Sequence, residues 1–222
     1  MKLSVSDLIQ LSIFLISLAV FVQKPVPLYL RLFPVYFFLL MIVDKVLEYT
    51  SELGLHNNIL LNTWGPVEFS FYFFVIEQVI ASRKVKKRIL YATLAFVIFA
   101  FINLFFFQNN DLFNPINFTI GTIITVVLCI YYFFELFQKT EAQSLTRLPS
   151  FWVVSAVLFN VVLIFPIFAL VSFMNSLSKA NLKTSMIIFD NIVAIFNIIS
   201  VLTYILYSIG FLCRIRTSKS TL

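Results

Sequence analysis

The chain has 222 residues, of which 61% are hydrophobic, 12% are charged and 28 are Phe. Soluble domains average about 45–50% apolar and about 25% charged residues, so this composition excludes an ordinary soluble protein. A membrane-spanning helix needs about 20 apolar residues, and the length therefore allows about seven crossings and no sizeable soluble domain. The net charge of +6 comes from loops between apolar runs, so we expect it to meet lipid head groups and not nucleic acid.

The apolar runs predict an all-α, polytopic membrane protein with seven transmembrane helices in a single domain, residues 1–222. In chain order the expected helices span residues 5–22, 29–49, 59–81, 89–107, 118–137, 151–174 and 185–213. The first run follows Lys2, as a secretory signal would, but no small-residue cleavage site precedes residue 23, which favours an uncleaved helix. In the second run, Pro34 is expected in the first helical turn, where a missing N–H costs little.

A basic block, Arg83–Arg88, stands between the third and fourth runs, and five of its six residues are cationic. We expect it to form a short cytoplasmic loop, because Lys and Arg in short loops resist translocation. With seven crossings, twelve Lys and Arg residues fall on this side of the membrane and three on the other. The sequence therefore predicts a bacterial inner-membrane protein with its N-terminus outside and its C-terminus inside.

Two segments resemble each other at an offset of 115 residues. One runs from Gln23-Lys24 to Leu30-Arg31-Leu32-Phe33-Pro34, the other from Gln138-Lys139 to Leu145-Thr146-Arg147-Leu148-Pro149, with eleven residues from Gln to Pro in both. Residues 1–82 and 116–214 would then be parallel repeats joined by a linker helix at 89–107. The alternative is chance, since loops that enter a membrane often contain Lys, Arg and Pro.

This three-plus-one-plus-three plan resembles the SWEET, PQ-loop and nicotinamide riboside transporters. The resemblance lies in architecture alone, because the chain contains no Pro-Gln dipeptide. It implies a solute site near the membrane midplane, between the two repeats.

A second resemblance is carried by Pro66-Val67-Glu68-Phe69-Ser70-Phe71-Tyr72 and Pro149-Ser150-Phe151-Trp152. These combinations are similar to small seven-helix membrane proteins of Bacteroidota, over most of the chain. The resemblance implies a fold and no particular activity.

Polar and ionisable side chains inside the apolar runs form the candidate site, because such groups are costly in hydrocarbon. Glu68, Asn160 and Asn197 lie nine to twelve residues from a helix end, which places them near the midplane at about 1.5 Å per residue. Others lie in the outer half, where Asp44 and Glu48 share one helix face. The candidate ligand-binding residues are Asp44, Glu48, Trp64, Glu68, Tyr72, Asn103, Asn160, Asp190, Asn197 and Tyr204.

Each candidate taken alone is explained as well by a polar contact between helices, worth about 0.6–2 kcal/mol. The set as a whole, with the carboxylates of Asp44, Glu48, Glu68 and Asp190 and the single cation Lys45, exceeds what helix bonding needs. It predicts an acidic, water-filled cavity open to the outside, suited to a cation, a proton or a neutral polar solute. Trp64, Tyr72 and Tyr204 could add stacking or cation–π contacts.

Several catalytic classes lack the residues that they require. His56 is the only histidine, which is too few for a zinc hydrolase, and residues 185–213 contain no lysine for a retinal Schiff base. Only four glycines are present, and none forms a phosphate-binding loop. We expect no metal, no cofactor and no catalytic residue, although a carboxylate-only lipid enzyme stays open.

The leading hypothesis is a small carrier, proton-coupled or not, that binds its solute between the second, third, sixth and seventh helices. Glu68 would be its midplane proton or cation group. One alternative is a receptor-like sensor that signals to a cytoplasmic partner through residues 83–88 and 214–222. Another is an ion channel built as a homo-oligomer.

Overall fold

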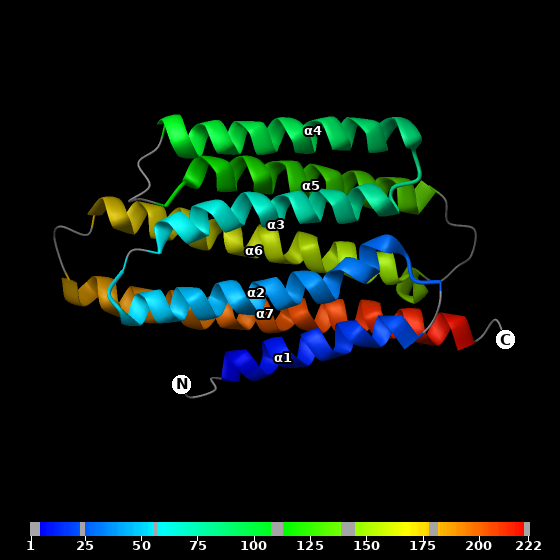
Figure 1. Cartoon of the computed structure of the whole chain (residues 1–222), viewed down its shortest axis with the longest axis horizontal. Coiled ribbons are helices and arrows are strands. Elements are labelled where there is room, and N and C mark those ends of the chain that lie inside the picture. The colour runs from blue at the N-terminus through cyan, green and yellow to red at the C-terminus, as the bar shows by residue number, and fades with distance from the viewer. Residues whose placement is uncertain are drawn as a thin grey trace.

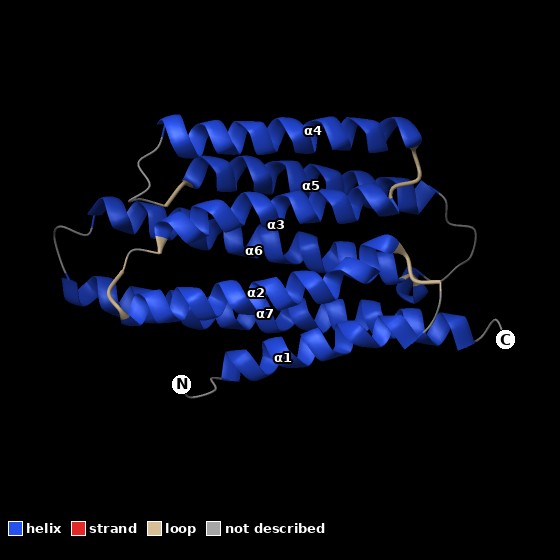
Figure 2. Cartoon of the chain, viewed as in Figure 1, coloured by secondary structure: helices blue, strands red, loops and turns tan. Residues whose placement is uncertain are grey.

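The computed structural model describes residues 5–22, 25–55, 57–107, 113–138, 145–177 and 182–219, without the side chains of residues 5, 171–191, 193 and 216–219. Within these residues the chain is all-α (Figure 2). The helices are α1 (Val5–Leu18), α2 (Leu28–Glu52), α3 (Asn58–Val79), α4 (Arg83–Ile102), α5 (Pro115–Gln138), α6 (Pro149–Leu177) and α7 (Leu182–Lys219). Short helical turns are η1 (Ala19–Val22), η2 (Asn103–Phe107) and η3 (Leu145–Arg147).

Five of the helices in the described part of the chain, α3 to α7, are long and apolar enough to cross a membrane. The apolar stretch of α1 and η1 is shorter, and α2 carries acidic residues and Lys45 in its second half. The predicted all-α chain of seven helices is confirmed for the described residues, and each helix overlaps one predicted apolar run. The chain is thus a helical bundle of the membrane-protein class.

Six helices form a closed ring, and the remaining helix lies outside it. Neighbours in the ring are α1 and α2, α2 and α3, α3 and α5, α5 and α6, α6 and α7, and finally α7 and α1. The helix α4 packs against α3 on the outer side, at the top of Figure 1. Because α1 starts at one end of the bundle and α7 finishes at the other, the chain traverses the bundle an odd number of times (Figure 1).

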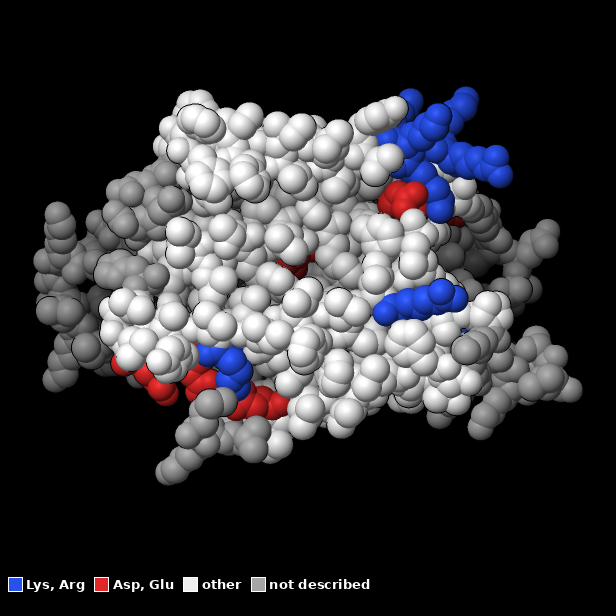
Figure 3. All heavy atoms as spheres, in the orientation of Figure 1, with Lys and Arg blue, Asp and Glu red and all other residues white. Residues whose placement is uncertain are grey.

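The basic block is helical, which corrects the predicted loop: Arg83–Arg88 forms the first turns of α4. Lys and Arg favour a helix, but at its N-terminus they face the positive end of the helix dipole. A carboxylate from α5 offsets this repulsion, since Glu135 accepts the backbone N–H groups of Ala81 (2.7 Å) and Ser82 (3.1 Å). Figure 3 shows Lys and Arg gathered at this end of the bundle, here called the basic end.

Pro34 also differs from its predicted place, because it lies inside α2 and not in its first turn. The helix begins earlier, where the carbonyl of Pro27 accepts the N–H groups of Leu30 (3.1 Å) and Arg31 (3.2 Å). Membrane helices tolerate an internal proline where neighbouring groups compensate for the lost hydrogen bond. The predicted run begins at residue 29, one residue after the observed start at Leu28, so Pro34 lies in the second turn from either start.

Aromatic side chains fill the centre of the bundle on the basic side of its midpoint. Phe33 of α2 contacts Phe71 of α3 and Tyr207 and Phe211 of α7, with ring centroids 5.2–5.3 Å apart. Edge-on and tilted aromatic pairs of this kind add about 0.5–1.5 kcal/mol beyond their buried area. The aromatic cluster therefore ties three helices of the ring together.

The helices α3 and α5 approach closely at Gly121, whose hydrogen faces the ring of Phe69. A Cβ added there would lie 2.4–2.7 Å from three Phe69 carbons, and Phe69 is itself buried. Gly121→Ala is therefore expected to lower the free energy of unfolding by about 1–3 kcal/mol, the usual effect of overpacking.

Unfolding of the purified protein in mixed micelles measures this change. Gly65→Ala is the matched control, because a Cβ at that helical position meets no atom within 4 Å. Equal stability of the Gly121 and Gly65 variants would contradict the close approach.

Candidate functional site

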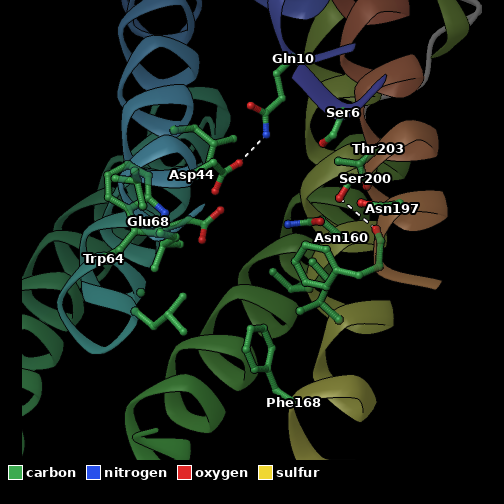
Figure 4. A pocket seen from close by; sticks show the side chains of 18 of the residues that line it. Ser6, Gln10, Asp44, Trp64, Glu68, Asn160, Phe168, Asn197, Ser200 and Thr203 are labelled. Atoms are coloured by element: carbon green, nitrogen blue, oxygen red, sulfur yellow. Dashed lines mark hydrogen bonds between the residues drawn. The ribbon is translucent and has the colours of Figure 1, made fainter. Parts of the chain in front are cut away.

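A cavity of about 670 Å³ lies inside the ring of helices. Side chains from α1, α2, α3, α5, α6 and α7 line it, and Figure 4 shows how they converge. The cavity runs from the middle of the bundle to the end where α1 starts and α2 finishes, here called the acidic end. Figure 3 shows acidic side chains gathered at that end, and also at the floor of a hollow on the face of α2 and α3.

The inner part of the cavity is built around Glu68 of α3. It is ten residues from the first residue of α3, so it lies about 15 Å along the helix, near its middle. One carboxylate oxygen, Oε1, accepts the hydroxyl groups of Tyr36 (2.7 Å) and Tyr72 (2.6 Å). The two hydroxyls are 3.1 Å apart, and Asn160 Nδ2 of α6 donates to Tyr72 at 3.2 Å. Three helices thus hold this carboxylate in place.

A second carboxylate, Asp44 of α2, accepts a hydrogen bond from Gln10 of α1. The spacing of α2 places Asp44 on the same face as Tyr36, eight residues earlier, so both point into the cavity. Figure 4 shows Asp44 and Glu68 on one wall, with Gln10 reaching over from α1. Both acids are therefore bonded by neutral donors.

The cation Lys45 is engaged at the acidic end, where its ammonium lies 2.7 Å from Asp7 Oδ1 and 2.5 Å from Glu48 Oε2. This ion-pair cluster joins α1 to α2 at the entrance of the cavity. In the part of the chain that the structure describes, neither Asp44 nor Glu68 forms a salt bridge. Among the described residues, the two carboxylates inside the cavity therefore have no cation paired with them.

The opposite wall comes from α6 and α7 and offers amide and hydroxyl groups. Asn160, Asn197, Ser200 and Thr203 point into the cavity in Figure 4. A buried hydroxyl on this wall, Thr203 Oγ1, has no hydrogen-bond partner among the described residues. Its residue is only 2% exposed. An unpaired buried hydroxyl costs about 1–3 kcal/mol, so this wall can bind a further polar group.

The rest of the lining is aromatic. Phe168 of α6 stacks on Phe113 with centroids 4.9 Å apart and packs on Phe118 of α5 at 4.3 Å and on Phe196 of α7 at 6.4 Å. Figure 4 shows Phe168 at the side of the cavity away from Gln10. Trp64 lies nearly parallel to Tyr36 beside Glu68. The cavity thus has a carboxylate side and a phenylalanine side.

Most of the predicted site residues lie around this one cavity, although their role in binding stays a prediction. The lining includes Asp44, Glu48, Trp64, Glu68, Tyr72, Asn160, Asn197 and Tyr204. Asp190 belongs to α7, but its side chain is outside the described residues. Asn103 lies outside the lining, which corrects its predicted place in the site.

Asn103 belongs to a buried asparagine cluster beside α4. Its Nδ2 donates to Asn114 Oδ1 (3.2 Å) and Asn117 Oδ1 (3.0 Å), and Asn117 Nδ2 donates to the carbonyl of Ala100 (3.2 Å). Asn62 Oδ1 of α3 accepts the backbone N–H of Asn114 at 2.7 Å. The cluster fastens the end of α4 to α3 and α5, which is the helix-joining role that a membrane asparagine often has.

Two features of the site were not predicted from the sequence, namely the side chains of α1 and the hydroxyl groups that point into the cavity. Gln10 and Asp7 stand three residues apart in an apolar helix, a spacing that puts them on one face, so this signal was available. Tyr36 and Tyr207 lie within aromatic runs, where nothing in the sequence marks one ring as the inward one. Helix packing alone decides which of them reach the cavity.

The arrangement can bind a positively charged or hydrogen-bonding solute without any cofactor. Among the described residues, no three His, Cys, Asp or Glu side chains gather in a way that could hold a metal ion. No protein-family model, no curated protein and no solved structure matches this chain. The function of the chain therefore has to be argued from its cavity.

Proposed function

We propose that this protein is a small integral membrane carrier that binds a cationic or polar solute in the cavity between its helices. In this proposal all seven helices cross a bacterial inner membrane, with the basic end in the cytoplasm and the acidic end outside. Glu68 is the group at the midplane that binds the cation or the coupling proton. Asp44 and Glu48 line the outer path to it, and Asn160 and Asn197 hydrogen-bond the solute.

The observation that carries this proposal is the pair of carboxylates, Asp44 and Glu68, inside a large cavity. In the described part of the chain, only neutral donors bond them. A charge in a membrane interior is expensive unless water or an opposite charge accompanies it. A helix-joining role needs neither an open cavity nor two such acids. A positively charged solute would occupy the cavity and give both acids a counter-charge.

The order of contacts in the ring also supports a carrier. If α1 changes places with α5, α2 with α6 and α3 with α7, each pair of neighbouring helices in the ring becomes another neighbouring pair. The helix α4 stays outside the ring. This is the arrangement that two parallel three-helix repeats and a linker helix would give. Transporters built in this way bind solute at the interface of the repeats, near the midplane.

A sensor is the second candidate, because Arg83, Lys84, Lys87 and Arg88 are exposed at the basic end and could bind an acidic cytoplasmic partner. Flux separates the two functions. A carrier moves its solute in liposomes that contain no other protein, whereas a sensor binds solute there without moving it.

Uptake into proteoliposomes tests the carrier, with radiolabelled methylammonium, choline and glycerol as probes. We expect accumulation above that of protein-free liposomes, and a loss of about tenfold or more in Glu68→Gln, because one charge-assisted contact is worth about 1.5–3 kcal/mol. Glu77→Gln on the same helix is the control, because Glu77 lies outside the lining and bonds Gln78. Wild-type rates in Glu68→Gln would remove the assignment of this residue.

The proposed orientation is tested by cysteine labelling. In a Cys129→Ala, Cys213→Ala background, Leu55→Cys at the acidic end should react with an impermeant maleimide in intact cells. Lys87→Cys at the basic end should react only after the cells are permeabilised, because Lys- and Arg-rich segments stay inside. The reverse pattern would invert the orientation and place the cavity mouth in the cytoplasm.

A further inference from the structure

We propose that the solute is an organic amine with an apolar body, and that the cavity orients it. The ammonium group lies between Asp44 and Glu68, and the body lies against the phenylalanines around Phe168. This inference rests on the proposed function in taking the same cavity as the solute site, and it narrows the solute to one chemical class.

The charges inside the cavity favour a cationic solute. Lys45 is already bound by Asp7 and Glu48, and in the described part of the chain Asp44 and Glu68 are bonded only by neutral groups. A ligand that enters this side therefore meets two acids and no free cation from the described residues. An anionic solute would be repelled there, and a neutral solute would leave both acids without a counter-charge.

The size of the cavity favours an organic solute. A volume of about 670 Å³ is within the range of pockets for organic ligands, about 300–1,000 Å³. A water molecule occupies about 30 Å³ in the liquid, and a bare inorganic ion is of comparable size. An inorganic cation would leave most of the cavity to water, which gains little from aromatic walls. The volume thus favours a cation with a body.

The walls of the cavity carry aromatic side chains that suit an organic amine. Four phenylalanines contributed by three parts of the chain, Phe113, Phe118, Phe168 and Phe196, meet on one side of the cavity. On the carboxylate side, Trp64 and Tyr36 present nearly parallel rings, 6.4 Å apart, beside Glu68. Rings next to carboxylates suit an ammonium group, which is attracted by the faces of Trp and Tyr.

A buried hydroxyl of α7 points to a ligand independently of the acids. Thr203 is nearly fully buried and lines the cavity, and its Oγ1 has no hydrogen-bond partner among the described residues. Buried hydroxyls are normally bonded. An ammonium group carries up to three N–H donors, so it can bond a carboxylate and a hydroxyl of the facing wall together.

Ligand binding to the full chain in lipid nanodiscs tests this inference. The chain has two tryptophans, and Trp152 lies in the first turn of α6, where it donates to the carbonyl of Thr146 (2.8 Å). Trp152→Phe therefore leaves Trp64, inside the cavity, as the only tryptophan, whose emission can be excited selectively. Trp64→Phe is the matched control, because its remaining Trp152 reports only unspecific partition into the lipid.

Four probes separate charge from body: 2-phenylethylamine, uncharged 2-phenylethanol, anionic 3-phenylpropanoate and methylammonium. We expect saturable binding of the amine in the Trp152→Phe protein, with the alcohol and methylammonium at least about tenfold weaker and no saturation by the acid anion. If the alcohol binds as tightly as the amine, or if methylammonium does, the inference is wrong.

Two variants locate the parts of the ligand. Asp44→Asn combined with Glu68→Gln should bring the affinities for the amine and the alcohol within about twofold of each other. Phe168→Ala should weaken both by a similar factor and keep their ratio, since it removes contact with the body only. A ratio that survives the double variant would overturn the proposal. If that variant does not fold, the ratio of the amine and alcohol affinities is compared between Glu68→Gln and the parent protein. A ratio that Glu68→Gln leaves unchanged would likewise overturn the proposal.

The two proposals fail separately. Amine binding without uptake of the amine would leave the ligand class standing and refute the carrier. Uptake of methylammonium or glycerol without any preference for the amine would refute the ligand class and leave the carrier standing.

Discussion

Replacing Phe33 by alanine will lower the free energy of unfolding by about 3–5 kcal/mol, the usual range for a buried phenylalanine. Phe33 is 0% exposed, and its ring packs on Phe71, Tyr207 and Phe211. In a membrane the surroundings are apolar in either state, so the loss comes from packing contacts that an alanine cannot replace. Because these contacts join three helices of the ring, we expect the variant to fold poorly or not at all.

Phe38→Ala is the matched control for this substitution. Phe38 stands on the same helix and is 52% exposed on the outside of the bundle, where the surrounding medium can fill the space that a smaller side chain leaves. Its effect should stay below about 1 kcal/mol. Unfolding in mixed micelles of a detergent and sodium dodecyl sulfate measures both variants. Comparable losses in Phe33→Ala and Phe38→Ala would show that the aromatic cluster does not hold the ring together.

The helices themselves could be predicted from the sequence because apolar length is a strong signal in a membrane protein. Every predicted run overlaps one helix, since only a helix satisfies all backbone hydrogen bonds within a single segment in lipid. Helix ends were predicted less well. The block Arg83–Arg88 looks like a loop by charge, yet it forms the first turns of α4. Glu135, far away in sequence, accepts the N–H groups of Ala81 and Ser82 just before this helix.

The sequence predicts how far along their helices the site residues lie, but not which of these residues face each other. Glu68 and Asn160 stand out because a polar residue in the middle of an apolar helix needs an explanation, and their distance from the helix ends places them at one level. Whether two such residues face each other depends on helix rotation, which depth does not determine. The same reasoning assigned Asn103 to the site, whereas it bonds Asn117 and Asn114 beside α4.

Tyr72 was among the residues predicted from the sequence, whereas Tyr36 could not have been chosen from the 18% of aromatic residues in the chain. Tyr36 follows Phe33 by three residues, so the same stretch of α2 supplies a packing ring and a hydroxyl for the cavity. The aromatic cluster therefore fixes the position of the carboxylate as well as the helices. The two tyrosines that donate to Glu68, Tyr36 and Tyr72, are therefore the most informative positions to change.

Removing both hydroxyls, in Tyr36→Phe combined with Tyr72→Phe, should reduce cation uptake by about a hundredfold or more. Each hydroxyl donates to Glu68 Oε1, at 2.7 and 2.6 Å. A hydrogen bond to a charged group is worth about 1.5–3 kcal/mol, and about 1.4 kcal/mol corresponds to a factor of ten. Each single variant should therefore lose about tenfold, and Tyr72→Phe more than Tyr36→Phe, because Tyr72 also binds Asn160.

Uptake of the transported probe into proteoliposomes measures these losses, and two comparisons separate function from stability. Tyr132→Phe removes a hydroxyl that donates to Ser150 at 2.9 Å, away from the cavity, and should transport as the wild type does. Adding Glu68→Gln to the double tyrosine variant should cause little further loss, because the hydroxyls act through that carboxylate. Independent, additive losses from the tyrosines and from Glu68 would mean that the two hydroxyls serve the fold and not the binding of the cation.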